Sequence, residues 1–275
     1  MLLLENITGA SMDRDEWVKA RIGRFTSSEN YLLMAPKGLG QAGANYVYRK
    51  VGEKTSERPC RDEVLSVAIA HGNTYELEGL EKYRQFKGID EFQCIRVFVK
   101  DGERFGSTPD AIHCLSANSD GLSMNVSVIE VKCPYSFDAY IRLWKCTTPA
   151  DVRDEEFKYY IQVIDQMQVC GALTGSLVIY QPFFKEGGLR VIEFKATDKL
   201  IYDDMKLLNT RKGIAEEMFN KLREEMGVAY YVRAYNDPSL DYGSFQISAG
   251  VNNTRTEEVV SEILKECNTL KTEKV

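Results

Sequence analysis

An acid and a lysine stand two residues apart in the segment SVIEVKCPY, and a second acid precedes them by twenty residues. Glu130 and Lys132 lie in a short run of β-branched residues, so the spacing predicts that both side chains leave one face of a β-strand. Asp110 follows a proline in STPDAI, which we expect on the neighbouring strand. Two carboxylates held this close repel each other unless a cation lies between them. The three residues therefore predict a site for Mg²⁺, with Mn²⁺ as the other candidate.

A divalent ion at such a site stabilises the charge that grows on a scissile phosphate, and Lys132 can hold and help deprotonate the attacking water. The ordinary alternative is an exposed ion pair between Glu130 and Lys132 on an edge strand, which contributes under about 1 kcal/mol. The flanking residues have the pattern of a buried strand, and an exposed ion pair does not need such flanks. Spacing and flanks together favour a site that cleaves phosphodiester bonds.

Composition limits the classes of protein to which the chain can belong. Its 275 residues, 44% hydrophobic and 28% charged, are typical of a soluble globular protein, and no apolar run approaches the length of a membrane span. Seven cysteines without a C-x-x-C pair predict reduced thiols rather than disulfides, zinc or an iron–sulfur cluster. The net charge of −6 still allows a local basic groove. The first residues lack the basic lead of a secretory signal, so we expect a cytoplasmic protein, in the host cytoplasm if it is viral.

Hydrophobic periodicity predicts the elements that must position these residues. Helices are expected roughly over 61–86, 153–172 and 198–226, and strands in 91–102, 104–115, 126–134, 176–184 and 189–196. A helix cap is expected within 26–29, followed by a loop rich in Gly and Pro over 36–50. This order predicts an α/β (α+β) fold with a mixed sheet flanked by helices. We expect one nuclease domain over 1–235 and a C-terminal extension over 236–275 with a helix at 256–270.

The pattern P-D-x(19)-E-V-K resembles the signature of the PD-(D/E)XK nuclease superfamily. Four further segments resemble, in order, those of the YqaJ-type viral recombinases, the family of phage lambda exonuclease. They span roughly residues 15–180 and read WVKARIGRFTSSE, HGNTYELEGLEKY, FGSTPDAI and YYIQVIDQMQVCGA. The chain departs from the family pattern at Thr108 and Ala111, where Ser and Gly are usual, and at Ile164 and Asp165, where Gln-Gly is usual. The first pair keeps small residues at the turn, whereas the second pair affects the helix that carries the glutamines.

The resemblance implies a restriction-endonuclease-like core and a role for each residue of the strand site. Asp110 and Glu130 would be the main metal ligands, with the carbonyl group of Val131 as a third. Lys132 would activate the attacking water. Aromatic residues near this strand are expected mainly in the core, with stacking on a frayed base as the alternative; they are Trp17, Tyr135, Phe137 and Trp144.

Two helices would add further groups to the site. The resemblance implies that Glu76 holds a metal-bound water or a second metal; without it, Glu76 would be one glutamate among several on a solvated face. Gln162 and Gln166 lie four residues apart and share one helix face. The resemblance places Gln162 beside the active site, where it would orient water or phosphate, and the alternative is a polar helix surface.

Arg21 and Ser28 match family positions that receive a terminal 5′-phosphate. Arginine binds phosphate through two parallel N–H groups, and a hydroxyl at a helix start lies among free backbone N–H groups. A plain helix cap at Ser27 or Ser28 is an equal alternative, and the two roles are compatible.

The resemblance implies a Mg²⁺-dependent exonuclease that degrades one strand of linear duplex DNA from the 5′ end. The 3′ overhang would serve a strand-annealing partner in phage-type recombination, and the enzyme would form a closed homo-oligomer, a trimeric ring. One alternative is a structure-specific or restriction-type endonuclease with the same metal site, against which the 5′-phosphate residues argue. The other is a non-catalytic DNA-binding subunit, against which the complete set of acids and lysine argues. An iron–sulfur nuclease is excluded because Cys267 alone lies beyond Cys170.

Overall fold

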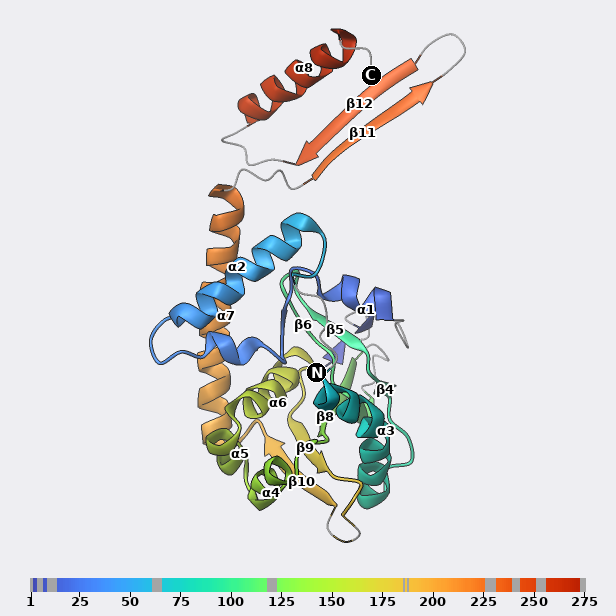
Figure 1. The fold of residues 1–275 in the computed structure, drawn as a ribbon, viewed down its shortest axis with the longest axis vertical. Coiled ribbons are helices and arrows are strands. Elements are labelled where there is room, and N and C mark those ends of the chain that lie inside the picture. Colours follow the sequence, from blue (N-terminus) through green and yellow to red (C-terminus); the bar gives the residue numbers. More distant parts are fainter. Residues whose placement is uncertain are drawn as a thin grey trace. The chain divides into compact units, whose positions relative to one another are not determined.

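The structure is a computed structural model (Figure 1) that describes residues 2–3, 7–8, 14–60, 66–117, 123–184, 186, 188–225, 231–238, 243–250 and 256–272. The chain divides into two compact units, Met1–Glu217 and Met218–Val275. This division falls inside α7 (Lys199–Glu225), and the domain boundary expected after residue 235 stays a prediction. No helix in the described ranges is long and apolar enough to cross a membrane.

A mixed six-stranded sheet forms the centre of the first unit. Its strands follow the order β10-β9-β8-β7-β4, and β1 pairs with β8 outside this path. Strand β8 is antiparallel to β7 and parallel to β9, so it lies in the middle of the sheet. The strands are β1 (Leu2–Leu3), β4 (Cys94–Ile95), β7 (Ala111–Ala117), β8 (Ser123–Lys132), β9 (Thr174–Tyr180) and β10 (Leu189–Lys195).

Helices α3 (Val67–Lys87) and α6 (Phe157–Val169) cover opposite faces of this sheet (Figure 1). The alternation of side chains along β8 determines which residues each helix meets. Val128 packs into the core that contains α6, whereas Val131 packs with Leu80 of α3 in a second cluster. Glu130 stands two residues from Val128 and therefore faces α6.

A smaller sheet has the order β2-β5-β6-β3. Its strands are β2 (Ile7–Thr8), β3 (Phe25–Thr26), β5 (Phe98–Asp101) and β6 (Phe105–Ser107). The two strands expected over 91–102 and 104–115 are each divided between the two sheets, and this corrects the prediction. One break lies at Arg96, whose φ of +53° is in the left-handed region, and the other contains Pro109 and Asp110. Proline cannot donate to a strand ladder, so Asp110 precedes β7 instead of lying within a strand.

The N-terminal helices also differ from the expectation. Residues 36–50, expected as a loop, contain most of α2 (Gly40–Ser56), because its Tyr46, Val47 and Val51 are buried. Burial of this face outweighs the low helix propensity of its glycines. The cap expected within residues 26–29 does not start an α-helix: a 3₁₀ helix, η2 (Asn30–Leu33), follows, and it has no side-chain cap.

The remaining predictions for the first unit are largely met. The helix expected over 61–86 is α3, although residues 61–65 lie outside the described ranges. The helix expected over 153–172 is instead two helices, α5 (Pro149–Glu155) and α6, because Glu156 between them has a non-helical backbone. The other helices are α1 (Arg14–Arg21) and α4 (Phe137–Lys145).

The second unit begins within α7. It contains an antiparallel hairpin of β11 (Tyr231–Pro238) and β12 (Gly243–Gly250), and the helix α8 (Thr256–Thr272). Helix α8 covers the range 256–270, in which a helix was expected.

Candidate active site

The carboxylate of Glu130 lies in the interior, with 3% of the residue exposed, and three side chains donate to it. Gln162 Nε2 donates to Oε1 and Gln166 Nε2 to Oε2, both at 2.5 Å, from adjacent turns of α6. Lys132 Nζ donates to Oε1 at 2.5 Å. Glu130 and Lys132 thus share one face of β8, as their spacing predicts. A buried carboxylate is stable only with such partners, so these donors fix both its charge and its orientation.

Asp110 lies beside Glu130, immediately before β7, because β7 and β8 pair antiparallel from the next residue onward. Its Oδ2 atom accepts a hydrogen bond from the Val131 N–H at 2.6 Å. Burial, and next the charges of Glu130 and Glu76, raise the pKa of the Asp110 carboxyl well above its usual value. Glu130 and Glu76 are therefore close enough to Asp110 to disfavour its charge.

Lys132 is held as a cation in this environment. Burial lowers the pKa of its ammonium group, but the charges of Glu130 and Asp110 outweigh this effect and raise the pKa above its usual value. Its Nζ atom also lies 5.0 Å from the ring centre of Tyr159, which sequence reasoning missed. The available signal was the position of Tyr159 three residues before Gln162, which places both side chains on one helix face.

Glu76 reaches the site from α3 and pairs with Arg96, whose Nε atom lies 2.8 Å from Glu76 Oε1. The backbone N–H of Arg96 donates to the carbonyl oxygen of Asp110 at 3.1 Å. Arg96 therefore connects two of the predicted acids. Sequence reasoning missed Arg96, because nothing in the local pattern signals a break of the strand at this residue.

Within the described ranges, no group of three or more carboxylate, histidine or cysteine side chains is arranged to hold a metal ion. Each predicted acid is bound to a protein donor instead: Glu130 to amides and a lysine, Asp110 to a backbone N–H, and Glu76 to an arginine. The donor set nevertheless suits a hard cation, since burial and the nearby charges of Glu130 and Glu76 raise the pKa of Asp110. The residues thus fit Mg²⁺ or Mn²⁺ in chemical type.

Cys133 follows the strand site directly but is a poor candidate for a metal ligand. Burial, and next the charges of Glu76 and Asp110, raise the pKa of the Cys133 thiol to about 12. The thiol therefore stays protonated at neutral pH, whereas metal ligation and nucleophilic attack need the thiolate. The site offers oxygen ligands, which excludes soft metal ions as its preferred occupants.

Arg21 and Ser28, which were predicted to bind a 5′-phosphate, both lie next to Thr26. Arg21 Nη2 donates to Thr26 Oγ1 at 3.4 Å, and the hydroxyl oxygens of Thr26 and Ser28 are 3.5 Å apart. Burial lowers the pKa of the Arg21 guanidinium, and no carboxylate in the described part of the chain forms an ion pair with it. Ser28 does not cap the helix that follows. Among the described residues, Arg21 is thus a partly buried cation without an ion-pair partner, which suits an incoming phosphate.

Trp17 connects Arg21 to the segment that carries Asp110. The guanidinium of Arg21 lies 4.2 Å from the Trp17 ring centre, and Trp17 Nε1 donates to Thr108 Oγ1 at 3.2 Å. Thr108 stands two residues before Asp110. Threonine keeps the hydroxyl of the serine that is usual here, so this departure from the family pattern preserves a hydrogen bond acceptor.

The second departure, at Ile164 and Asp165, has a structural role. Ile164 is fully buried in the main core. Asp165 is also fully buried, and its carboxylate accepts from Asn30 Nδ2 at 2.7 Å and forms an ion pair with Lys212 of α7. These residues connect α6 to η2 and α7, whereas Gln162 and Gln166 of the same helix face Glu130.

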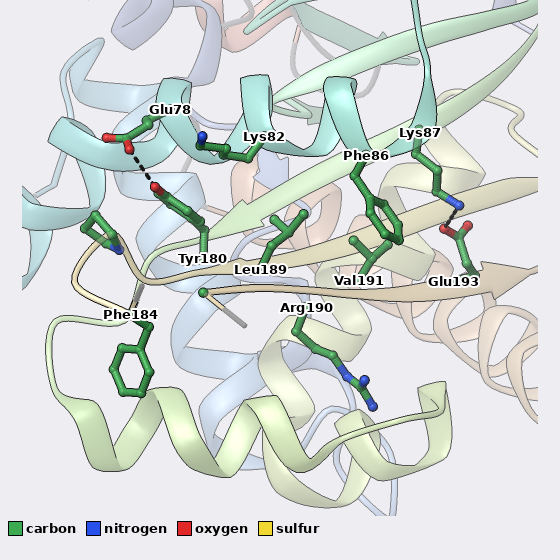
Figure 2. A pocket seen from close by; sticks show the side chains of 12 residues that line it. Glu78, Lys82, Phe86, Lys87, Tyr180, Phe184, Leu189, Arg190, Val191 and Glu193 are labelled. Atoms are coloured by element: carbon green, nitrogen blue, oxygen red, sulfur yellow. Dashed lines mark hydrogen bonds and ion pairs between the residues drawn. The ribbon is translucent and has the colours of Figure 1, made fainter. Parts of the chain in front are cut away.

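A groove of about 860 Å³ lies between α3 and the edge strand β10 (Figure 2). Within it, Tyr180 donates to Glu78 at 2.5 Å and Lys87 pairs with Glu193 at 2.7 Å. None of the predicted catalytic residues lines this groove. The candidate active site is therefore the group of charged residues around the end of β8, and not the groove.

Comparison of the sequence with family models gives two matches. The YqaJ-like viral recombinase domain matches residues 16–173, which is more than half of the chain. The Peptidase M16 inactive domain matches residues 194–275, which is less than half and assigns no second family. No curated protein matches the chain.

Solved structures of two exonucleases are similar in fold. An alkaline exonuclease (LHK-Exo) from Laribacter hongkongensis is 18% identical with a TM-score of 0.57, and the match covers 77% of this chain and 97% of that one. Its complex with dAMP gives the same identity and coverage with a TM-score of 0.56. A phage related exonuclease from Haemophilus somnus 129PT is 12% identical with a TM-score of 0.52, over 74% of this chain and 96% of that one. These likenesses confirm the predicted α/β fold with a mixed sheet.

Proposed function

Since this chain belongs to the YqaJ-like viral recombinase domain family, we propose that it is a metal-dependent exonuclease that degrades one strand of linear duplex DNA. The observation that carries the proposal is the arrangement around Glu130. Its buried carboxylate is fixed by Gln162, Gln166 and Lys132, and Asp110 lies beside it at the start of β7. A purely structural ion pair between Glu130 and Lys132 would not need Asp110, whose pKa is raised, beside it. The solved structures that share this fold include exonucleases.

Asp110, Glu130, Glu76 and the carbonyl group of Val131 would hold the metal ion, Mg²⁺ by preference, with Mn²⁺ as a substitute. When bound, the ion supplies Lewis-acid stabilisation of the negative charge that develops on the scissile phosphate. Repulsion between the carboxylates favours its uptake.

Lys132 and the α6 glutamines act on the water and the phosphate. Lys132 carries a positive charge beside the carboxylates. In this position it would bind the attacking water and stabilise the negative charge of the phosphate. Gln162 holds Glu130 and presents its amide at the same face of β8, where it orients the water. Hydrolysis adds the water oxygen to phosphorus and releases the 3′ sugar oxygen of the terminal nucleotide, so the shortened strand again carries a 5′-phosphate.

Arg21, Thr26 and Ser28 define the end of the DNA at which the enzyme works. The Arg21 guanidinium, which has no ion-pair partner among the described residues, and two hydroxyl groups nearby bind a terminal phosphate, which carries more charge than an internal one. A 5′-phosphate bound at Arg21 would direct the first internal phosphodiester of that strand toward the metal site. We therefore propose 5′-to-3′ digestion that leaves a 3′ overhang.

The family further supports a role in recombination of phage type, in the cytoplasm, with a single-strand annealing protein that takes up the overhang. We propose that the enzyme acts as a homo-oligomeric ring, a trimer, that encloses the DNA. Light scattering of the purified protein tests this part. It is expected to give the mass of three chains, and the mass of one chain would contradict the ring.

A digestion experiment tests the main proposal. Linear duplex and a covalently closed circle are incubated with the protein in Mg²⁺ or in EDTA. The linear duplex is expected to lose one strand from its 5′ ends in Mg²⁺ only, and the circle is expected to stay intact. Cutting of the circle would favour a structure-specific or restriction-type endonuclease, and binding without cutting would favour a non-catalytic DNA-binding subunit.

A further inference from the structure

Four aromatic rings from three separate segments meet beside the candidate active site, and we refer to them as the aromatic platform. His71 and Tyr75 come from the start of α3, with ring centres 4.7 Å apart. Tyr135 follows β8 and lies 5.6 Å from His71. Phe183, in the turn between β9 and β10, lies 6.2 Å from His71 and 5.8 Å from Tyr75.

The platform is exposed to solvent. Tyr135 is 55% and Phe183 62% exposed, although Tyr135 was expected mainly as a core residue. Grouped apolar side chains that stay exposed usually mark an interaction site. Within the platform, His71 Nε2 is shielded from water and has no hydrogen-bond partner in the described ranges, which costs stability. The cluster is therefore poorly explained as packing alone.

Its position is fixed relative to the predicted catalytic residues. Tyr75 precedes Glu76 in α3, and Tyr135 is the third residue after Lys132. The buried Gln181 holds the two loops together, because its Nε2 donates to the carbonyl oxygen of Pro134 at 2.9 Å and its Oε1 accepts from the Phe183 N–H at 3.5 Å. The exposed rings thus come from segments that directly adjoin Glu76 and Lys132 in the chain.

We propose that the aromatic platform stacks unpaired nucleobases of the DNA strand that enters the active site. This inference rests on the proposed function. It also names the part of the substrate that the platform recognises, which is the flat face of any nucleobase. Every base has a π-face, so stacking on aromatic side chains is tolerant of sequence. The terminal base pairs would have to open for the strand to reach the metal site, and stacking on Tyr135 and Phe183 compensates for the stacking lost in the duplex.

A binding experiment in EDTA tests this inference without cleavage. The probes are two 5′-phosphorylated duplexes with a short unpaired 5′ tail, one with bases in the tail and one with abasic sites. For the wild-type protein, removal of the bases is expected to weaken binding about fivefold or more. The variant Tyr135→Leu/Phe183→Leu keeps apolar side chains but has no π-faces, so it is expected to bind both probes equally.

Phe86→Leu is the matched control, because Phe86 is an exposed phenylalanine of α3 outside the platform. It is expected to keep the wild-type difference between the probes. A double variant that also keeps this difference, or a wild-type protein that does not distinguish the probes, would overturn the inference. Digestion of blunt duplex in Mg²⁺ by the same preparations separates the two proposals. A wild-type protein that cuts DNA but binds both probes equally overturns the platform alone. A wild-type protein that neither binds nor cuts DNA overturns both proposals.

Discussion

Arg96 donates from Nε to Oε1 of Glu76 at 2.8 Å, and this ion pair orients the carboxylate that α3 contributes to the candidate site. The same arginine has a left-handed backbone, with φ of +53°, where the chain passes from one sheet to the other. Its side chain is 45% exposed, so the pair is weak enough to open when a cation takes its place. Glu76 is thus shared between an arginine and the metal ion that we propose.

Removal of the Arg96 side chain should therefore strengthen the binding of the metal ion by Glu76. Arg96→Gly suits the positive φ, so it removes the side chain without backbone strain. Because an exposed ion pair contributes about 0.2–1 kcal/mol, the Mg²⁺ concentration for half-maximal digestion is expected to fall by about two- to fivefold. Arg84→Gln, which breaks the ion pair with Glu81 elsewhere on α3, serves as the control and should have no effect. An unchanged or higher Mg²⁺ requirement in Arg96→Gly would show that Glu76 is not released toward a metal.

The phosphate pocket predicts a dependence on the 5′ end group. Arg21→Lys keeps the charge but loses the planar group that lies over Trp17. The ratio of digestion rates for 5′-phosphate and 5′-hydroxyl ends is expected to fall about tenfold or more, the loss of one charge-assisted hydrogen bond. Arg24→Lys is the matched control, since within the described ranges Arg24 donates to the carbonyl groups of Gly102 and Glu103, away from Thr26 and Ser28. A ratio unchanged by Arg21→Lys would remove the pocket from the account.

Repulsion between the carboxylates predicts a gain in stability when one charge is removed. The pKa of Asp110 is raised in the folded protein, so its ionised form disfavours folding at neutral pH. In EDTA, Asp110→Asn is expected to raise the free energy of unfolding by an amount on the order of 1 kcal/mol. Mg²⁺ should stabilise the wild-type protein but not the variant. Urea denaturation measures both effects, and equal stabilisation of the two proteins by Mg²⁺ would contradict a metal site at Asp110.

The buried ion pair of Asp165 and Lys212 predicts a non-additive effect on stability. Lys212→Met leaves the Asp165 charge buried without its cation and is expected to lower the free energy of unfolding by about 3–5 kcal/mol. The double variant Asp165→Asn/Lys212→Met removes both charges and keeps an acceptor for Asn30, so it should recover most of this loss. Additive losses in denaturation experiments would show that the two residues do not stabilise each other.

Local pattern predicted the parts of the site that depend on one strand or one helix. Glu130 and Lys132 share a face because side chains alternate along a strand, and Gln162 and Gln166 share a face because they stand four residues apart on a helix. The pairing of Asp110 with this strand followed from the short polar connection between β7 and β8. These relationships are short in sequence, so composition and spacing determine them.

The remaining features depend on contacts between distant segments. The break at Arg96 and its bond to Glu76 arise where two sheets meet, and no local pattern marks that place. Asp165 departs from the family pattern in a helix of functional residues, yet its partners Asn30 and Lys212 lie far away in sequence and make it structural. Helix α2 was missed for the same reason: its glycines predict a loop, and only packing in the folded protein shows why the helix forms.

Single-turnover cleavage by Lys132→Ala tests the central claim most directly. The protein is held in excess over linear 5′-phosphorylated duplex in Mg²⁺, and binding to the same DNA is measured in EDTA. The cleavage rate is expected to fall by about 10²- to 10⁴-fold with binding little changed, because Lys132 acts on the water at the site. Lys158→Ala removes the other lysine over the Tyr159 ring and should cleave at close to the wild-type rate. Cleavage by Lys132→Ala at the wild-type rate would contradict the assignment of the active site to the end of β8.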